Sequence, residues 1–275
     1  MRYLVEAQDL RPFYNADGTG KDFTLSFWVK AKQTGTYSLG IHKADNTTRF
    51  ITTTYTIDAA DTWQFVEWNI TGDTNTSGIN ADNGQGFQIA WIFAAGTNFT
   101  SGGVQSSWGS FSNSLMAGGQ AVNSLDNTAN YWRITGIQLE LGSKATPFEH
   151  RSYGEELSRC QRYFYRHAWG AIASNGTNDS ITDNAAMYNA TSVFMSIPLP
   201  VQMRSAPTLG DANSSNYYLV YANNASATPS TFGLDGVTSK NILTINGTTA
   251  SLTSGAAALV RTNHADAYID AIAEL

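Results

Sequence analysis

Cysteine is nearly absent from this sequence. Cys160 is the single cysteine among 275 residues, so no disulfide can form within the chain. One thiol also excludes the clusters of cysteines that hold structural zinc. A chain that needs no oxidising environment for its folding is expected to fold in the cytosol.

Charge is also scarce, since only 14% of the residues are Asp, Glu, Lys or Arg and the net charge is -6. No cluster of Lys and Arg is present, which argues against a nucleic-acid partner because phosphates require a basic surface. No apolar run approaches the roughly 18 residues that a membrane span needs, and the N-terminus lacks the features of a signal peptide. We therefore predict neither nucleic-acid binding nor membrane insertion.

The common catalytic motifs are missing too. The sequence has no G-x-S-x-G, H-E-x-x-H, C-x-x-C or phosphate-binding loop. A Cys160 nucleophile served by His150 or His167 can be written down, but a cysteine packed on an apolar helix stripe is favoured, because free cysteines are usually buried. The prediction is a protein without enzymatic activity, catalytic residues, cofactor or metal.

Acidic residues leave one enzymatic alternative open, because glycoside hydrolysis needs two carboxylates at a fixed separation. Asp58 and Asp61 follow a predicted strand, where aspartate is an ordinary turn residue. Residues 72–84 carry oxygen ligands but lack the spacing of a calcium loop, so a polar turn is expected there. The candidate carboxylates for hydrolysis are Asp58, Asp61, Glu67, Asp73 and Asp82.

Alternating apolar residues are the main signal that is present. In "FTLSFWVKAK" the side chains of Phe23, Leu25, Phe27 and Val29 fall on one face, which is typical of a half-buried strand. The same period recurs in residues 36–43, 49–57, 63–70, 86–96 and 131–142, each bounded by Gly, Asn or Asp. The pattern predicts an antiparallel sandwich. It breaks at Gly136, which indicates a bulge, and the Gly- and Ser-rich residues 100–130 are expected on the surface.

A capped helix follows these strands. Ser152 and Glu155 have the spacing of a capping box, and Glu155 lies four residues before Arg159, which permits an ion pair. Leu157, Cys160 and Phe164 form a narrow apolar stripe. Beyond Tyr163 the period returns to two, so the helix is expected to be short and to lead into a strand.

Further strand patterns fill the second half, at 186–200, 216–222 and 267–275, and Asn246-Gly247 is a typical hairpin signal. The predicted fold class is therefore all-β, with two β-sandwich, jelly-roll-like domains. The first covers residues 1–150, a helical joint covers 151–166, and the second sandwich covers 167–275.

Exposed aromatic rings beside Asn, Asp or Gln are the groups with which all-β domains bind sugars. Seven tryptophans are candidates: Trp28, Trp63, Trp68, Trp91, Trp108, Trp132 and Trp169. Trp91 and Trp132 are in register with apolar neighbours and are expected in the core. The predicted ligand contacts are Trp108, Tyr217, Tyr218, Tyr221 and Asn223. For the tyrosines, packing within their own domain or against another subunit is the alternative.

The segment "WRITGIQLELGSKATPFEHRSYGEELSRCQRYFYR", residues 132–166, resembles a junction found in bacteriophage tail-fibre and related virion receptor-binding proteins. The likeness lies in the W-x-I-T-G-x-Q-L-E-x-G strand, the A-T-P-F-E-H-R bend and the G-E-E-L-x-x-C-Q-R-Y helix start. In that family a carbohydrate-binding-module-like jelly roll precedes a C-terminal β domain. "FTLSFWVKAKQTGTYSLGI" and "ITTTYTIDAADTWQFVEWNITGDT" resemble earlier strands of the same module, while "LPVQMRSAPTL" and "DAIAEL" resemble the C-terminal domain.

This resemblance implies a homotrimer in the virion, assembled in the host cytoplasm, in which Leu157, Cys160 and Phe164 of three chains meet at the axis. It also implies attachment to other virion proteins through the N-terminal side, with further β sequence ahead of Arg2. The expected function is non-enzymatic adhesion to a host-surface glycan. The alternatives are a purely structural fibre or capsid-decoration protein and a glycan-degrading tailspike-type hydrolase.

Overall fold

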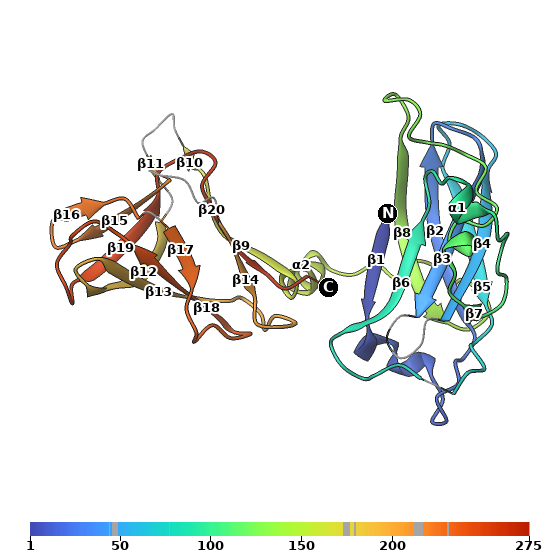
Figure 1. Ribbon diagram of the computed structural model, residues 1–275, viewed down its shortest axis with the longest axis horizontal. Helices are drawn as coiled ribbons and strands as arrows, with labels where there is room; N and C mark the ends of the chain where they lie inside the picture. Colours follow the sequence, from blue (N-terminus) through green and yellow to red (C-terminus); the bar gives the residue numbers. More distant parts are fainter. Residues whose placement is uncertain are drawn as a thin grey trace. The chain divides into compact units, whose positions relative to one another are not determined.

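The computed structural model divides the chain into two compact units, residues 1–150 and 151–274 (Figure 1). It describes the chain apart from residues 44, 46–48, 77, 173–176, 179, 212–216, 230 and 275. Both units consist mainly of antiparallel strands, so the predicted all-β class is confirmed. Within the described residues, no helix has the length and hydropathy needed to cross a membrane.

The first unit is built from strands and three short helical turns. Its elements are β1 (Arg2–Glu6), η1 (Ala7–Phe13), β2 (Phe23–Ala31), β3 (Gly35–Lys43), β4 (Arg49–Ile57), β5 (Gln64–Ile70), β6 (Gln85–Trp91), α1 (Thr97–Thr100), β7 (Gly109–Ser110), η2 (Asn113–Leu115) and β8 (Trp132–Leu141). The strands predicted from alternation between residues 23 and 142 are present, although the strand predicted at 86–96 ends at Trp91. They form a five-stranded sheet in the order β1-β6-β3-β4-β7 and a three-stranded sheet in the order β5-β2-β8.

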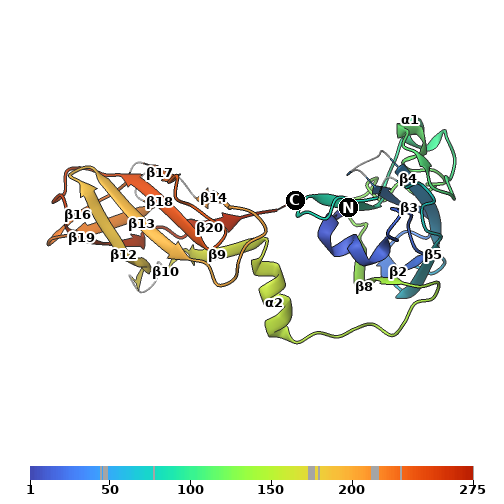
Figure 2. The same cartoon turned by 90° about the horizontal axis from the view of Figure 1, so that it is seen from below.

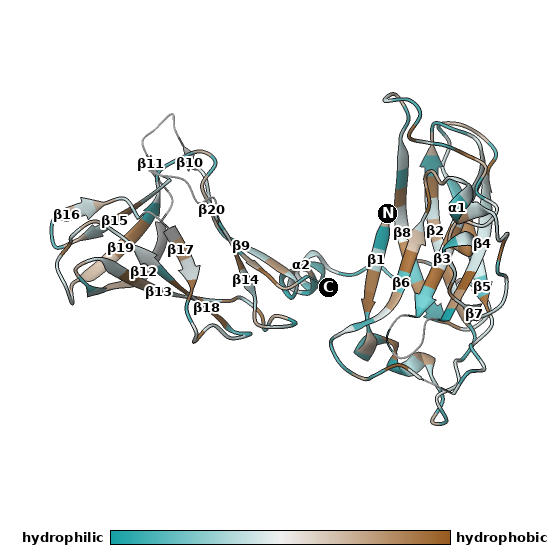
Figure 3. Cartoon of the chain, viewed as in Figure 1, coloured by the Kyte–Doolittle hydropathy of each residue, from teal (hydrophilic) through white to brown (hydrophobic). Residues whose placement is uncertain are grey.

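The core of the first unit lies between these two sheets. Phe23, Leu25, Phe27 and Val29 are all buried, as the alternation along β2 predicts. Phe27 meets Trp91 edge to face, with the ring centroids 5.8 Å apart. The hydrophobic and hydrophilic bands that alternate along the strands are visible in Figure 3. Each strand thus contributes one face to the core and leaves the other face outside it.

The predicted bulge at Gly136 is confirmed. The register of β2 against β8 shifts between Ser26 and Trp28, and Gly136 has a φ of +58°. This conformation costs glycine little because it has no Cβ. The bulge moves the side chains that follow it relative to β2, so it determines which residues of β8 lie beside Trp28.

The second unit begins with the helix and continues as strands. Its elements are α2 (Tyr153–Gln161), β9 (Phe164–Trp169), β10 (Ala171–Ile172), β11 (Thr177–Asn178), β12 (Ser180–Asn189), β13 (Ser192–Pro198), β14 (Thr208–Asp211), β15 (Tyr218–Ala222), β16 (Ala225–Ala227), β17 (Thr231–Leu234), β18 (Ile242–Thr248), β19 (Ala257–Thr262) and β20 (Tyr268–Ile272). Seven strands form one sheet in the order β16-β15-β19-β12-β13-β18-β17, and β14-β20-β9 form another. Figure 2 shows β12, β13 and β18 side by side.

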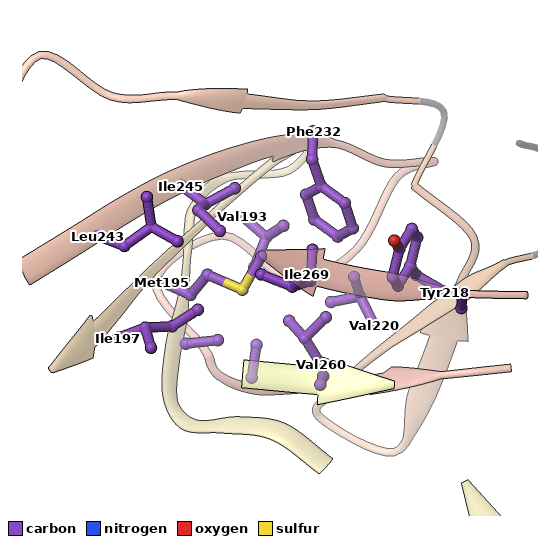
Figure 4. Packing of buried hydrophobic residues seen from close by; sticks show 14 of the residues in the cluster. Val193, Met195, Ile197, Tyr218, Val220, Phe232, Leu243, Ile245, Val260 and Ile269 are labelled. Atoms are coloured by element: carbon purple, nitrogen blue, oxygen red, sulfur yellow. The ribbon is translucent and has the colours of Figure 1, made fainter. Parts of the chain in front are cut away.

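The core of the second unit joins its two larger sheets. Val193, Met195 and Ile245 from the seven-stranded sheet belong to the same buried cluster as Ile269 and Ala271 of β20. Figure 4 shows Val193, Met195, Ile245 and Ile269 at the centre of this cluster. The strand predicted at the end of the chain is present as β20, and its alternate residues Ile269 and Ala271 are buried.

The helix follows its predicted cap. Ser152 is the N-cap residue, and its Oγ accepts a hydrogen bond from the Glu155 amide (3.3 Å). The Glu155 carboxylate accepts from Arg159 Nη2 (3.1 Å), as the four-residue spacing predicts. Helix α2 ends at Gln161, and β9 begins three residues later, so the short helix leading into a strand is confirmed.

The prediction of a hairpin turn at Asn246-Gly247 is wrong. Both residues lie inside β18, where Asn246 pairs with Phe194 of β13 and with Gly233 of β17. A Cβ on Gly247 would lie 2.8 Å from the Phe232 ring, so this glycine makes room for a core aromatic side chain. Tertiary packing thus explains a residue that local turn statistics assign to a loop.

Candidate functional site

The predicted sugar contacts of the second unit lie around the hairpin between β15 and β16. Asn223 and Asn224 have φ values of +48° and +61°, which are the left-handed conformations of a two-residue hairpin turn. Asn223 Nδ2 donates to Thr253 Oγ1 (3.1 Å). A shallow hollow of about 460 Å³ beside the turn is lined by Tyr221, Ala222, Asn223, Asn224, Ala225, Ser226, Ala257, Ala258 and Leu259. Two predicted residues, Tyr221 and Asn223, are therefore brought together.

The Tyr221 side chain in this hollow already contacts another side chain of the protein, Arg261. The Arg261 guanidinium lies 4.7 Å from the ring centroid, and Arg261 Nη2 donates to the Tyr221 hydroxyl (3.2 Å). None of the other eight lining residues is aromatic and four of them are alanine, so they offer little area for stacking. The hollow thus has hydrogen-bonding groups at its rim but only part of an aromatic surface.

Two other tyrosines of the predicted site are not available to a ligand in the same way. Tyr218 is buried, its ring packs edge to face against Phe232, and its hydroxyl donates to the Tyr268 carbonyl (2.6 Å). Its assignment as a ligand contact is wrong, because β15 turns this side chain into the core (Figure 4). Tyr217 is half-buried and stacks on His264 with the centroids 4.1 Å apart. Packing within the domain, the alternative considered for the tyrosines, accounts for both.

The prediction that Trp108 is an exposed ligand contact also needs correction. Trp108 was expected to be exposed in the loop 100–130, but its ring lies 6.0 Å from Phe87 and packs against the core cluster. Its Nε1 donates to the Thr71 carbonyl (2.9 Å). The loop lies against the sandwich closely enough to bury Ala117, and Trp108 is half-buried where it fastens the loop.

A group of exposed aromatic side chains lies on the outer face of the sheet β5-β2-β8, and it was missed as a site. Trp28, Trp63 and Phe65 are 44%, 42% and 43% exposed. Trp28 of β2 pairs in register with Phe65 of β5, and their rings lie 5.4 Å apart with a 53° angle between their planes. The signal was present in the alternation, which places Trp28 and Lys30 on the face of β2 opposite the core residues.

Strand β8 completes this face on the other side of β2. Thr135 pairs with Trp28, and Arg133 pairs with Lys30. A Cβ at the bulge residue Gly136 would lie 3.4 Å from the Trp28 ring and 3.8 Å from the Phe148 ring, so the glycine makes room for both rings. We call Trp28, Lys30, Trp63, Phe65, Arg133 and Thr135 the outer aromatic face.

The neighbouring part of the same sheet face is covered by residues 143–149. Glu140 accepts hydrogen bonds from the amide and the hydroxyl of Thr146 (2.9 and 2.6 Å), and the Glu149 amide donates to Gln138 Oε1 (2.9 Å). Thr24 and Ser26, which pair with Glu140 and Gln138, are buried. The segment reaches the edge of the aromatic group, because Phe148 and Trp28 both lie beside Gly136.

Charged groups lie beside the exposed rings of the face. The Lys30 ammonium lies 6.0 Å from the centroid of the Trp63 ring, and the Arg133 guanidinium lies 4.8 Å from that of Tyr131. Lys32 forms an ion pair with Asp61 (2.9 Å), which also accepts from the Tyr131 hydroxyl. These hydrogen bonds from Lys32 and Tyr131 hold the pKa of Asp61 below its ordinary value. The face therefore carries fixed positive charge beside an exposed aromatic surface.

The carboxylates considered for hydrolysis are in part engaged elsewhere. Asp73 is buried and binds Arg49 through two hydrogen bonds (2.7 and 3.1 Å), so the polar stretch 72–84 uses this side chain for structure. Asp61 is held by Lys32 and Tyr131 as described. Glu67 is exposed and pairs in register with Ser26 of β2.

The three residues predicted to meet in a trimer lie on α2 and β9. Leu157 and Cys160 are on the helix, whereas Phe164 is the first residue of β9. All three are exposed in the single chain, and none of the residues of α2 is buried. The expectation of a packed Cys160 is therefore wrong within the second unit, where the thiol is exposed.

Comparison of the chain with protein-family models, with curated proteins and with solved structures gives no match.

Proposed function

We propose that this chain is a non-enzymatic adhesin that binds a glycan through the outer aromatic face. The observation that supports this most strongly is the presence of two tryptophans and a phenylalanine, each more than 40% exposed, at one end of a regular sheet. Aromatic rings gathered on one exposed face often mark a binding site, and their faces pack against the apolar faces of sugar rings. Strands hold such side chains in fixed positions, which lowers the entropic cost of binding.

The polar neighbours of the rings suit the same ligand. Thr135, Lys30 and Glu67 lie beside the aromatic side chains and can exchange hydrogen bonds with hydroxyl groups. The hollow at Tyr221 and Asn223 offers less stacking area, because Arg261 already lies over the tyrosine ring. The outer aromatic face is therefore the stronger candidate, and the hollow is the second position to test.

A double variant tests the role of the rings. Trp28→Ala/Phe65→Ala should weaken binding to host cells or to an array of host glycans by roughly 10- to 100-fold, since each ring contributes about 0.5–1.5 kcal/mol beyond its buried area. The control is Trp169→Ala, which removes another exposed tryptophan from the second unit. Unchanged binding in the double variant, with loss in Tyr221→Ala/Asn223→Ala, would place the site at the hollow instead.

The resemblance of residues 132–166 to phage fibre proteins supports a place in the virion. In this proposal the protein is assembled in the host cytoplasm as a homotrimer and is attached to other virion proteins through its N-terminal side. Three copies would raise a weak affinity for each site by avidity. The absence of binding to any glycan or cell would favour a purely structural fibre or decoration protein, and release of reducing sugar would favour a hydrolase.

The trimer contact on α2 has its own test. A nine-residue helix is marginally stable unless its apolar stripe is covered, and α2 buries none of its residues in the single chain. Leu157→Ala/Cys160→Ser should therefore shift the trimer to monomer in sedimentation experiments, while Ser158→Ala beside the stripe should not. A double variant that stays fully trimeric would show that α2 does not hold the assembly together.

A further inference from the structure

Two cations face each other on the outer aromatic face. Lys30 of β2 and Arg133 of β8 are paired in register, so their Cβ atoms lie roughly 5 Å apart on one side of the sheet. Like charges in this position repel one another and destabilise a sheet. An acidic residue opposite Lys30 would remove this repulsion, and the chain has 22 acidic residues against 16 basic ones. The pairing of two cations is therefore unusual for this chain.

Asp61, an acidic group whose carboxylate interacts with the charge of Lys30, is already engaged. Asp61 binds Lys32 and accepts a hydrogen bond from Tyr131, so its charge is shared by a third cation. Lys30, Lys32 and Arg133 together carry three positive charges against the one negative charge of Asp61. Two positive charges therefore remain in excess at this end of the face.

Both cations are also held in place. The Lys30 ammonium lies near the Trp63 ring and the Arg133 guanidinium lies over the Tyr131 ring. Contacts of this kind orient a cation without neutralising its charge. Arg133 is exposed and Lys30 is half-buried, so a ligand on the face can reach both.

The charges are arranged in a fixed order along the strands. Lys30 lies two positions after Trp28 on β2, which corresponds to roughly 6.6 Å and is comparable to the width of one sugar ring. Glu67 lies on the opposite side of the Trp28–Phe65 pair, where it is paired with Ser26. A ligand that stacks on the two rings thus meets positive charge at one end and negative charge at the other.

We infer that the outer aromatic face binds an acidic polysaccharide, with a sugar ring stacked on Trp28 and Phe65 and its carboxylate directed to Lys30 and Arg133. This inference rests on the proposed glycan binding and adds the class of ligand. A carboxylate between the two cations relieves their repulsion and forms charge-assisted hydrogen bonds with both. Glu67 disfavours the reverse orientation of the sugar, because it would place two negative charges together.

The probes are polygalacturonate, its methyl ester, dextran and polyglutamate, measured against the complete chain by calorimetry or biolayer interferometry. The ester keeps the sugar backbone and removes the charge, whereas polyglutamate keeps the charge and removes the sugar. We expect polygalacturonate to bind at least tenfold more tightly than its ester and more tightly than polyglutamate. Its binding should weaken as salt is raised, since exposed charges are screened.

Two charge variants complete the test. Lys30→Gln/Arg133→Gln should weaken binding of polygalacturonate about tenfold and weaken binding of the ester by a much smaller factor, since glutamine keeps a hydrogen-bond donor at both positions. Glu67→Gln removes the negative charge from the other end of the same face and should raise the affinity for polygalacturonate. Equal affinity for the acid and the ester, abolished by Trp28→Ala/Phe65→Ala, would overturn the acidic ligand and keep the proposed function. Binding to glycans that is insensitive to the ring variant and to the charge variant would overturn both.

Discussion

Replacing Asp73 with alanine should lower the free energy of unfolding of the first unit by about 3–5 kcal/mol. The Lys43 side chain is fully buried, and its Nζ lies 3.5 Å from the Asp73 carboxylate. Arg49 binds the same carboxylate and is 22% exposed. Loss of Asp73 leaves the Lys43 charge in the protein interior without its counter-ion, which is the costly way to break a buried ion pair.

The control for this variant is Lys32→Ala. It breaks the ion pair with Asp61, in which both side chains are about half exposed, so the expected change is between 0 and about 1 kcal/mol. Urea unfolding of both variants gives the comparison. A loss in Asp73→Ala no larger than in Lys32→Ala would show that Lys43 is solvated or neutral without cost.

The same carboxylate gives a dependence on pH with a defined sign. Burial raises the pKa of Asp73, but the hydrogen bonds from Arg49 and the Asn75 amide and the charges of Arg49 and Lys43 outweigh it and leave this pKa below its ordinary value. The stabilisation is therefore present at pH values above the ordinary pKa of an aspartate. It is lost as the pH falls through the lowered pKa of the folded state, and Asp73→Ala should not show this loss.

Replacing Trp91 with alanine should destabilise the first unit by about 3–5 kcal/mol and leave the second unit unchanged. Trp91 is 1% exposed and packs against Phe27, so alanine leaves a large cavity between the sheets. The buried clusters of the two units share no residue, so we expect two calorimetric transitions. Trp91→Ala should lower only one of them.

Two further variants assign these transitions. Met195→Ala removes a buried side chain from the second core and should lower the other transition by about 2–5 kcal/mol. Trp169→Ala removes an exposed tryptophan and should move neither. A single transition that shifts as a whole in both Trp91→Ala and Met195→Ala would contradict separate unfolding of the units.

The features of the fold that could be predicted from the sequence are local ones. The alternation in residues 23–31 identifies the core face of β2, and the break at Gly136 identifies the bulge, because both depend on the two-residue period of a strand. The Ser152 cap depends on residues three positions apart. The prediction of a turn at Asn246-Gly247 is wrong because it considered local residues alone. The residues that hold this pair in a strand, such as Phe232, come from another part of the chain.

The candidate site was harder to predict because exposure of an aromatic side chain is decided by distant residues. Trp108 lies in a Gly- and Ser-rich loop and has every local mark of an exposed residue, yet Thr71 and Phe87 hold it against the sandwich. Tyr218 and Tyr221 lie on one strand on opposite sides of the sheet. The sequence shows that the two side chains point to opposite faces of the strand, but it does not show which face lies against the core.

By itself, the sequence determined the all-β class, the positions of the strands in the first unit and the capped helix, since these follow from period and capping over a few residues. Only the tertiary structure decided which aromatic side chains stay open. The register of β2 against β5 and β8 brings Trp28, Phe65 and Arg133 onto one face, although they are widely separated along the chain. Local periodicity carries no information on register between distant strands, because register is set by the packing of the whole sandwich.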